Sequence, residues 1–396
     1  MPALVFAKVN KETLRFIRDK KQISFNYIER IAKLKEAQVS LWEDETSVKL
    51  PTINQAKELA KCYRVPFAGF YMNSVDINIK HLPRFVNKRT MIGAVADDSA
   101  VNLALLDLIC ERDFYLEIKD ILREDKPVFN LHIPDSFGIS EWARIIREYF
   151  DLKLTDQYKS PSKRKFYLYL REKIEKKGIF IQGFQKVDVG TLRGVAIVDG
   201  SLPIIGINDE DRYPAKSFSI LHELIHVIKR TSSICNDMYG SNSSDDEEVF
   251  CNAVAGEVLV PQNALLSLLK NFPQISIKEI DSIANKFSVS SEVIARRLYD
   301  IGKCGKIWYE QISDELARRF IDERENLKAV VKMGISEGPR RNMPREAVDR
   351  TSTSLCDALL KGYSEGIFDK ADISAHIGIG QKHISKFVTE VMGWYL

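Results

Sequence analysis

The stretch SFSILHELIHVIK, Ser217 to Lys229, places two of the chain's six histidines four residues apart with a glutamate between them. On an α-helix, residues i and i+4 lie on one face about 6 Å apart along the axis, so two imidazoles at this spacing can reach one ion. Catalytic zinc sites use three protein ligands and keep one position open. The HExxH spacing therefore predicts a zinc-binding helix with His222 and His226 as ligands.

Glu223, between the two histidines, is the predicted general base. The helix places it beside the ion, where it can take a proton from zinc-bound water, whose pKa the metal lowers from about 16 to about 7. It can then pass that proton to the leaving amine. The competing interpretation is an ordinary buried helix. Its apolar stripe at positions i, i+3, i+4 and i+7 comprises Leu221, Leu224, Ile225 and Ile228.

A third ligand is sought in the acidic helix that follows a long polar loop. Its carboxylates are Asp245, Asp246, Glu247, Glu248 and Glu257. Glu248 and Glu257 are about 180° apart around the helix and roughly 13 Å apart along it, so they cannot share a site. Glu248 is the predicted ligand, because the loop is long enough for its helix to pack across the HExxH helix. Asn252, one turn further on, is predicted to support the site, and Cys251 is a weaker candidate ligand.

At this point a family resemblance appears. FSILHELIHVI followed by EEVFCNAVAGEVLVP resembles the ImmA/IrrE family of zinc metallopeptidases, whose pattern is an HExxH helix and then a helix with E-x-x-x-N, small residues and Leu-x-Pro. The similarity extends over residues 139–312. It implies a gluzincin-like site with His222, His226 and Glu248 on zinc and Glu223 as base. It also implies a mainly α fold with a small β-sheet, an α+β zincin-like catalytic core.

Three features of the site stay open at this point. Two imidazoles and one carboxylate accept zinc or manganese, and the affinity order favours zinc. Tyr239 and Arg212 are candidate donors to the oxyanion. A β-hairpin is predicted around Asp199-Gly200, and an extended substrate segment is expected to add to an edge of this hairpin, over residues 195–208.

The first 72 residues are predicted to form short helices joined by tight turns, with N-caps at Ser24 and Thr52. The run YIERIAKLKEAQVSLWEDETSVKLPTINQAKELAKCYRVPFAGFYM resembles lambda-repressor-like (XRE-type) helix-turn-helix domains. Such domains place their third helix in the major groove of double-stranded DNA. The candidate DNA-contacting residues are Lys35, Gln38 and Ser40, since glutamine can read adenine and lysine can contact phosphate.

Acidic residues near this third helix oppose DNA binding. Glu36, Glu43, Asp44 and Glu45 are expected to repel phosphate. Docking of a protein by the same domain is therefore the alternative interpretation. The charge distribution favours nucleic acid only mildly: residues 1–70 hold 13 basic and 8 acidic residues, whereas the whole chain has a net charge of +3.

Composition defines the broad class of the protein. The chain has 396 residues, 45% hydrophobic and 29% charged, which is typical of globular proteins. It lacks a run of about 18 apolar residues, so no membrane partner is expected. The six cysteines are scattered and form no CxxC pair, which favours free thiols in a reducing compartment. The predicted location is the cytoplasm.

The chain is divided into five predicted segments. They are a helix-turn-helix domain over 1–72, a connecting helical segment over 73–138, the zincin-like core over 139–270, a helical extension over 271–333 and a C-terminal helical domain over 334–396. The clearest linker is 334–344, which is rich in glycine and proline. Residues 280–298 and 370–387 also resemble helix-turn-helix pairs. For both, a hairpin that packs or recognises a protein is the favoured interpretation, with Arg296 and Arg297 solvated or facing substrate.

The leading functional hypothesis is a cytoplasmic zinc endopeptidase that cleaves a regulatory protein, with a helix-turn-helix repressor as the candidate substrate. The first alternative is a DNA-binding transcriptional regulator in which the peptidase fold serves as a sensor. The second alternative is a toxin–antitoxin module controlled through its own N-terminal domain.

Overall fold

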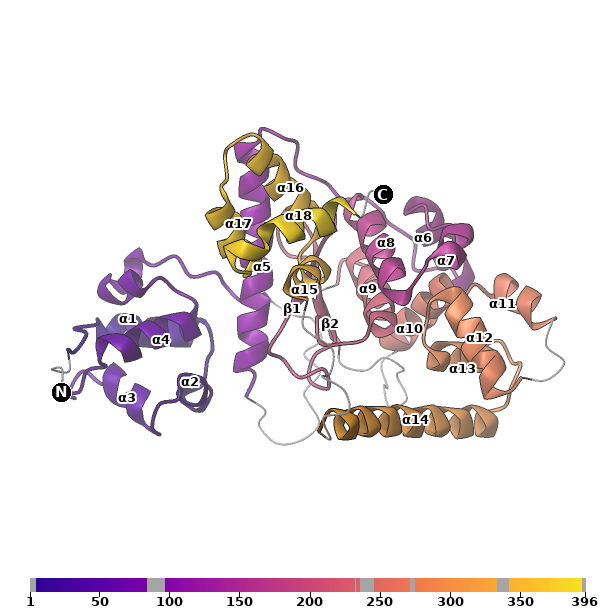
Figure 1. The fold of residues 1–396 in the computed structure, drawn as a ribbon, viewed down its shortest axis with the longest axis horizontal. Coiled ribbons are helices and arrows are strands. Elements are labelled where there is room, and N and C mark those ends of the chain that lie inside the picture. The colour runs from indigo at the N-terminus through magenta and orange to yellow at the C-terminus, as the bar shows by residue number, and fades with distance from the viewer. Residues whose placement is uncertain are drawn as a thin grey trace. The chain divides into compact units, whose positions relative to one another are not determined.

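The computed structural model describes residues 5–83, 97–231, 233–235, 246–270, 275–332 and 342–393 (Figure 1). The fold is mainly helical with one small β-sheet, which confirms the fold class expected from the sequence. The chain divides into two compact units. The first comprises Met1–Arg84, Arg89–Glu111 and Gln185–Val187, and the second comprises Phe85–Lys88, Arg112–Phe184 and Asp188–Leu396.

The first unit is a bundle of short helices around one apolar core. Its elements are α1 (Lys11–Lys20), α2 (Phe25–Ile31), α3 (Gln38–Glu43), α4 (Ile53–Tyr63), η1 (Phe67–Tyr71), η2 (Ser74–Asp76) and the N-terminal part of α5 (Ser99–Ile121). The buried core includes Leu14, Ile28, Trp42, Leu59 and Phe70. The predicted caps are confirmed, because the Ser24 and Thr52 hydroxyls accept hydrogen bonds from the backbone N–H groups of Tyr27 and Gln55.

Helix α3 begins at Gln38, after a turn at Ala37. Ala37, its N-cap, has a φ of 59°, in the left-handed region, and supplies no side-chain cap. The buried carboxylate of Glu29 takes over this role, because its oxygens accept from the N–H groups of Ala37 at 3.1 Å and Val39 at 2.8 Å. A charge from α2 therefore fixes the start of α3.

The second unit contains the sheet and most of the helices. Its helices are the C-terminal part of α5, α6 (Ile139–Tyr149), α7 (Leu154–Lys159), α8 (Lys163–Glu175), α9 (Tyr213–Ile228), α10 (Asp246–Leu259), α11 (Gln262–Leu269), α12 (Ile277–Phe287), α13 (Ser291–Asp300), α14 (Lys306–Lys332), α15 (Met343–Arg350), α16 (Thr353–Ser364), α17 (Lys370–Ile377), η3 (Gln381–His383) and α18 (Ile384–Met392). Helix α9 contacts α8, α10 and the strands β2 and β3 (Figure 1). It is therefore the central helix of this unit.

The sheet has the strand order β1-β3-β2-β4. Its strands are β1 (Phe180–Phe184), β2 (Gly194–Ile197), β3 (Ile204–Asn208) and β4 (Ser233–Cys235). β2 and β3 form the predicted antiparallel hairpin, and Gly200 in its turn has a φ of +104°. β1 pairs parallel with β3, and β4 pairs antiparallel with β2. Both edges of the hairpin are thus occupied, so the expected addition of a substrate segment to a hairpin edge is wrong.

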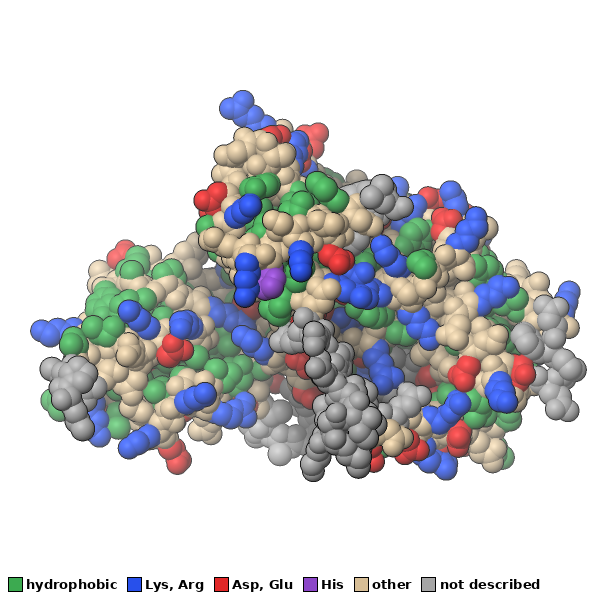
Figure 2. Space-filling view, in the orientation of Figure 1, with side chains coloured by type: hydrophobic (Ala, Val, Ile, Leu, Met, Phe, Trp, Pro, Cys, Tyr) green, Lys and Arg blue, Asp and Glu red, His purple; other side chains and the backbone are tan. Residues whose placement is uncertain are grey.

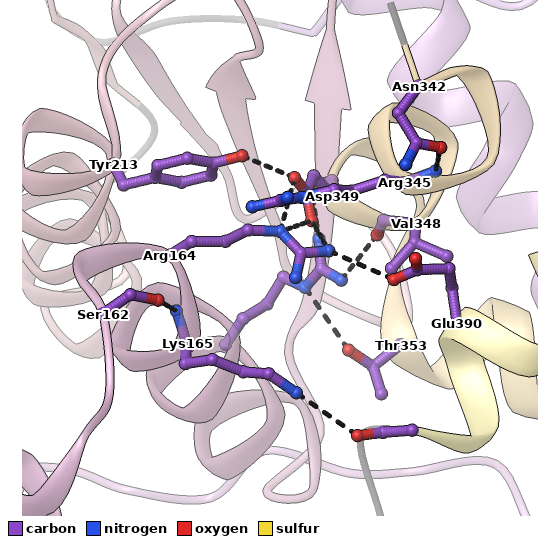
Figure 3. Close-up of polar contacts among 12 residues, drawn as sticks. Ser162, Arg164, Lys165, Tyr213, Asn342, Arg345, Val348, Asp349, Thr353 and Glu390 are labelled. Atoms are coloured by element: carbon purple, nitrogen blue, oxygen red, sulfur yellow. Dashed lines mark hydrogen bonds and ion pairs between the residues drawn. The ribbon is translucent and has the colours of Figure 1, made fainter.

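Two buried arginines of α8 hold the C-terminal helices against the core, and Figure 3 shows the contacts of one of them, Arg164. Arg164 donates from Nε to both carboxylate oxygens of Asp349, at 2.8 and 2.9 Å. Arg171 donates to the backbone carbonyls of Asp349 and Val348, at 2.7 and 3.0 Å. Tyr213, the first residue of α9, donates its hydroxyl to Asp349 at 2.6 Å. Helices α8, α9 and α15 are therefore joined through a single carboxylate.

Three further predictions from the sequence can be compared with the structure. Arg297 is buried and forms an ion pair with Glu257, so the prediction that it is solvated or faces substrate is wrong. The five cysteines whose side chains are described form no disulfide. Most of the predicted linker, residues 334–341, lies outside the described residues, and residues 343 and 344 begin α15.

No single described helix is long and apolar enough to cross a membrane. Helices α10 and α11 reach the required length and composition only as a pair, and they are bent by 55° with respect to each other.

Candidate metal centre

The candidate site lies where α9 and α10 pack together. Helix α9 starts with Pro214 in its first turn, which suits a position whose N–H has no helical partner. Every residue of α9 from 215 to 228 is buried, because the helix packs between the sheet and other helices. Both histidines therefore lie inside the protein, with exposed fractions of 2% for His222 and 1% for His226.

Three side chains from these two helices converge on a common point. The Nε2 atoms of His222 and His226 are 3.2 Å apart. The carboxylate oxygens of Glu248 lie 3.3 Å from Nε2 of His222 and 3.4 Å from Nε2 of His226. Among the described residues, these three form a group whose ligand atoms all lie within 4.8 Å of one another. The structure thus brings the three predicted ligands together, while metal binding by them stays a prediction.

These separations fit the ligand shell of a zinc ion. Zinc–nitrogen and zinc–oxygen distances are about 2.0–2.1 Å, so two ligand atoms of a tetrahedral site lie about 3.3–3.4 Å apart. The separation of the two Nε2 atoms, 3.2 Å, is close to that value. The two imidazoles lie 3.3 and 3.4 Å from different oxygens of the Glu248 carboxylate. His222, His226 and Glu248 would supply three protein ligands to a bound ion, the number that a catalytic zinc site uses.

Both imidazoles are oriented by contacts at their other nitrogen. Nδ1–H of His222 donates to Oδ1 of Asn252 at 2.9 Å, which places the supporting residue predicted from the sequence. Nδ1 of His226 lies 3.2 Å from the hydroxyl oxygen of Thr231, within hydrogen-bond distance. That hydroxyl lies 3.4 Å from a carboxylate oxygen of Glu247. With its proton at Nδ1, each ring would present the lone pair of Nε2 to a bound ion at the common point.

Thr231 is expected to contribute to metal affinity. In the Thr231→Val variant the side chain keeps its shape but loses the hydroxyl that lies within hydrogen-bond distance of His226. Loss of such a supporting contact typically weakens metal binding about 10–100-fold. Competition with a chromophoric chelator measures the change. Thr231→Ser, which keeps the hydroxyl, is the matched control, and equal zinc affinity in the valine and serine variants would rule out this role.

The predicted base, Glu223, is fully buried and lies against strand β2. A Cβ atom added to Gly194 would lie 2.8 Å from Oε1 of Glu223 and 3.0 Å from its Cγ. Glycine at this position is therefore what allows the carboxylate to approach the strand. Glu223 is not part of the three-residue group, which is consistent with a role beside an ion rather than on it.

Gly194→Ala is expected to displace the Glu223 carboxylate while leaving the metal ligands in place. The strand backbone accepts alanine, because Gly194 does not need a positive φ, so the added methyl group acts mainly on Glu223. A displacement of about 1 Å at a reacting group costs up to about 100-fold in rate. We expect peptide hydrolysis to fall by roughly 10- to 100-fold with unchanged zinc content. Gly138→Ala, where the nearest atom is 3.9 Å from the new Cβ, is the control.

The charges of the cluster are strongly coupled in the metal-free chain. Burial lowers the pKa of His226, but its side-chain interactions with Cys251 and Glu248 outweigh burial and raise this pKa to about 10. Burial raises the pKa of Glu248, but hydrogen bonds from His222 and His226 outweigh it and hold the pKa well below its ordinary value. The Glu248 carboxylate is thus stabilised in its charged form by positive charge on the neighbouring imidazoles. A divalent cation bound there can supply that positive charge in place of a proton.

Two site residues, and the role of a third, were not found from the sequence. Thr231 lies just beyond the C-terminal end of α9, Gly194 is in β2, and the role of Glu247 depends on its distance to Thr231. Only the strand pairing and helix packing bring these residues to the site. Arg212 is the N-cap of α9, roughly 15 Å along the helix axis from His222, which argues against it as an oxyanion donor. Tyr239, the other candidate donor, lies outside the described residues.

The candidate DNA-contacting residues lie at the start of α3 in the first unit. Lys35 is exposed, whereas Gln38 and Ser40 are half-buried. The side-chain oxygen of Gln38 accepts from the N–H of Lys35 at 3.0 Å, and the Ser40 hydroxyl donates to the carbonyl of Ala37 at 2.9 Å. Glu43 is buried and pairs with Arg18 at 3.0 Å, so its expected repulsion of phosphate is wrong.

Comparison with protein families agrees with this geometry. Residues 174–299 match the model of the IrrE N-terminal-like domain, Peptidase_M78. This segment extends from the end of α8 into α13 and contains both helices of the site. The match supports a metallopeptidase-type fold for the core of the second unit. A comparison with curated proteins found no match.

Proposed function

We propose that this protein is a zinc-dependent endopeptidase that hydrolyses a peptide bond in a regulatory protein. The convergence of His222, His226 and Glu248 on one point, with Glu223 next to His222 in the sequence of the same helix, carries the proposal. The match of residues 174–299 to a peptidase family supports it.

In the proposed mechanism, each residue of the site has one task. His222, His226 and Glu248 would hold the ion, and Asn252 and Thr231 keep the two rings aligned. A bound zinc ion would supply Lewis acidity that activates water at neutral pH and polarises the scissile carbonyl. Glu223 accepts the proton of the attacking water and donates it to the leaving amine. Burial of these side chains keeps bulk water away from the reacting groups.

We propose a helix-turn-helix repressor as the substrate class. The ImmA/IrrE resemblance supports this assignment, and the first unit, with short helices and a capped α3, is compatible with a domain that recognises DNA or another protein. The first alternative, a transcriptional regulator, would bind duplex DNA without requiring hydrolysis by Glu223. The second, a toxin–antitoxin module, would arrest growth on expression, and His226→Ala would relieve that arrest.

Metal removal and replacement test the proposed activity. A peptide library derived from a whole proteome is incubated with the full chain, and new termini are identified by mass spectrometry. We expect cleavage that stops on treatment with a zinc chelator and returns when zinc is added back. Equal cleavage before and after complete metal removal, or no cleavage by the zinc-loaded chain, would contradict the proposal.

A further inference from the structure

The C-terminal helices α17 and α18 form a helix-turn-helix within the second unit. Helix α17 ends at Gly378, which has a φ of +72°, and the chain turns through η3 into α18. The Ser374 hydroxyl donates to the carbonyl of Ile379 at 2.6 Å and closes the turn. Arg350 donates to the carbonyl of Ile377 at 2.7 Å, at the C-terminal end of α17. The turn is thus fixed by a left-handed glycine and two side-chain hydrogen bonds.

Six apolar residues of this motif are used for packing. The buried side chains are Ile373, Ile377, Ile379, Ile384, Phe387 and Val391. Within each helix these buried residues recur every three or four positions, which is the spacing of one helix face. From the sequence, this segment was interpreted as a helical hairpin that packs or recognises a protein. In the structure, only one face of α18 is buried by packing.

The opposite face of α18 and its preceding turn is exposed and polar. Its exposed residues are Gln381, Lys382, Ser385, Lys386 and Thr389. Positions 382, 385, 386 and 389 follow the i, i+3, i+4, i+7 pattern of one helix face. Figure 2 shows Lys and Arg side chains around a histidine over the part of the surface where α17 and α18 lie in Figure 1.

The charges on this face are free to meet an anionic partner. Among the described residues, the lysine of this C-terminal region that forms ion pairs is Lys361, with Glu124 and Glu365, rather than Lys382 or Lys386. The nearby carboxylates are used elsewhere in the fold: Glu390 lies 3.9 Å from Arg164. Asp369 accepts from the N–H groups of Ala371 and Asp372 at the start of α17, at 2.6 and 2.9 Å.

We propose that the C-terminal helix-turn-helix binds double-stranded DNA, with α18 in the major groove. The groove of B-form DNA admits one α-helix, and glutamine, lysine, serine and threonine are side chains that contact base edges or phosphates there. A protein partner is less well matched, because interface centres are enriched in aromatic and apolar anchors, which this face lacks apart from Met392 at its end. The inference is independent of the peptidase activity.

Binding of a labelled, random-sequence DNA duplex to the full chain tests this proposal. The variant Lys382→Ala/Lys386→Ala is compared with Lys278→Ala/Lys303→Ala, which removes two lysines that are also exposed and unpaired among the described residues. Both pairs are made in chains that also carry Lys35→Ala and Gln38→Ala, which suppresses any contribution of the first unit. Fluorescence anisotropy is measured over a range of salt concentrations.

Removal of two phosphate contacts should lower the slope of log K against log salt by about 1.8 and weaken binding at least about tenfold at low salt. The Lys278/Lys303 pair should change neither quantity. A double-stranded RNA competitor should displace the DNA poorly, because the major groove of A-form RNA is too narrow for a helix. Equal affinity and slope in the two pairs, or no duplex binding before the α18 lysines are changed, would overturn the DNA assignment in favour of a protein partner.

Discussion

Replacing Glu223 by glutamine is expected to abolish peptide hydrolysis while zinc remains bound. Glutamine has the shape of glutamate, so the buried side chain can keep its place against Gly194. It cannot take the proton from water or return it to the leaving amine. Loss of general acid–base catalysis costs about 10²–10⁴-fold in rate. Cleavage of the peptide library and zinc content by mass spectrometry measure the two parts of this expectation.

An exposed glutamate outside the site provides the matched control for the Glu223→Gln variant. Glu310 lies on α14 at the surface, and Glu310→Gln removes the same charge without touching α9 or α10. It should hydrolyse peptides at the unchanged rate. Full activity of Glu223→Gln would show that another group is the base, whereas loss of zinc together with activity would show that Glu223 holds the metal.

The second large effect is expected on stability, from Asp349→Ala. Asp349 is buried and contacts Arg164 and Tyr213 directly. Its removal leaves the Arg164 guanidinium without its principal counter-charge in a buried environment. Breaking a buried ion pair in this way costs roughly 3–5 kcal/mol in the free energy of unfolding. Urea denaturation followed by circular dichroism measures the change.

A double variant separates the ion pair from the packing around it. Replacing both charges by apolar side chains of similar volume is often neutral, because no buried charge is left alone. Arg164→Met/Asp349→Leu should therefore recover much of the stability that Asp349→Ala loses. A free energy of unfolding for Asp349→Ala within about 0.5 kcal/mol of the unchanged chain, the range typical of surface substitutions, would contradict this account.

The sequence predicted the two helices of the site because local patterns define both. HExxH fixes two side chains on one face of α9, and helix geometry separates Glu248 from Glu257 on α10. The structure brings Glu248 to both imidazoles and turns Glu257 to Arg297. The carboxylate of Glu257 thus forms an ion pair that joins α10 to α13. Helix periodicity cannot identify Arg297 as its partner, because the two residues lie on different helices.

Other features depend on contacts between distant segments and were missed for that reason. Strand β4 lies within what reads as a polar loop, and it forms because it pairs with β2. Gly194 approaches Glu223 only when β2 packs on α9. In the first unit, the start of α3 is set by Glu29 of α2, whose carboxylate accepts hydrogen bonds from the N–H groups of Ala37 and Val39. Propensity and periodicity describe single segments and carry no information on such pairs.

Zinc binding by the purified full chain and by its Glu248→Ala variant tests the central claim most directly. Metal content and affinity are measured by mass spectrometry and by competition with a chelator. The account predicts one zinc ion per chain, and an affinity loss in Glu248→Ala larger than the 10–100-fold typical of a supporting contact. Zinc held equally tightly without the Glu248 carboxylate, or no zinc bound by the unchanged chain, would contradict it.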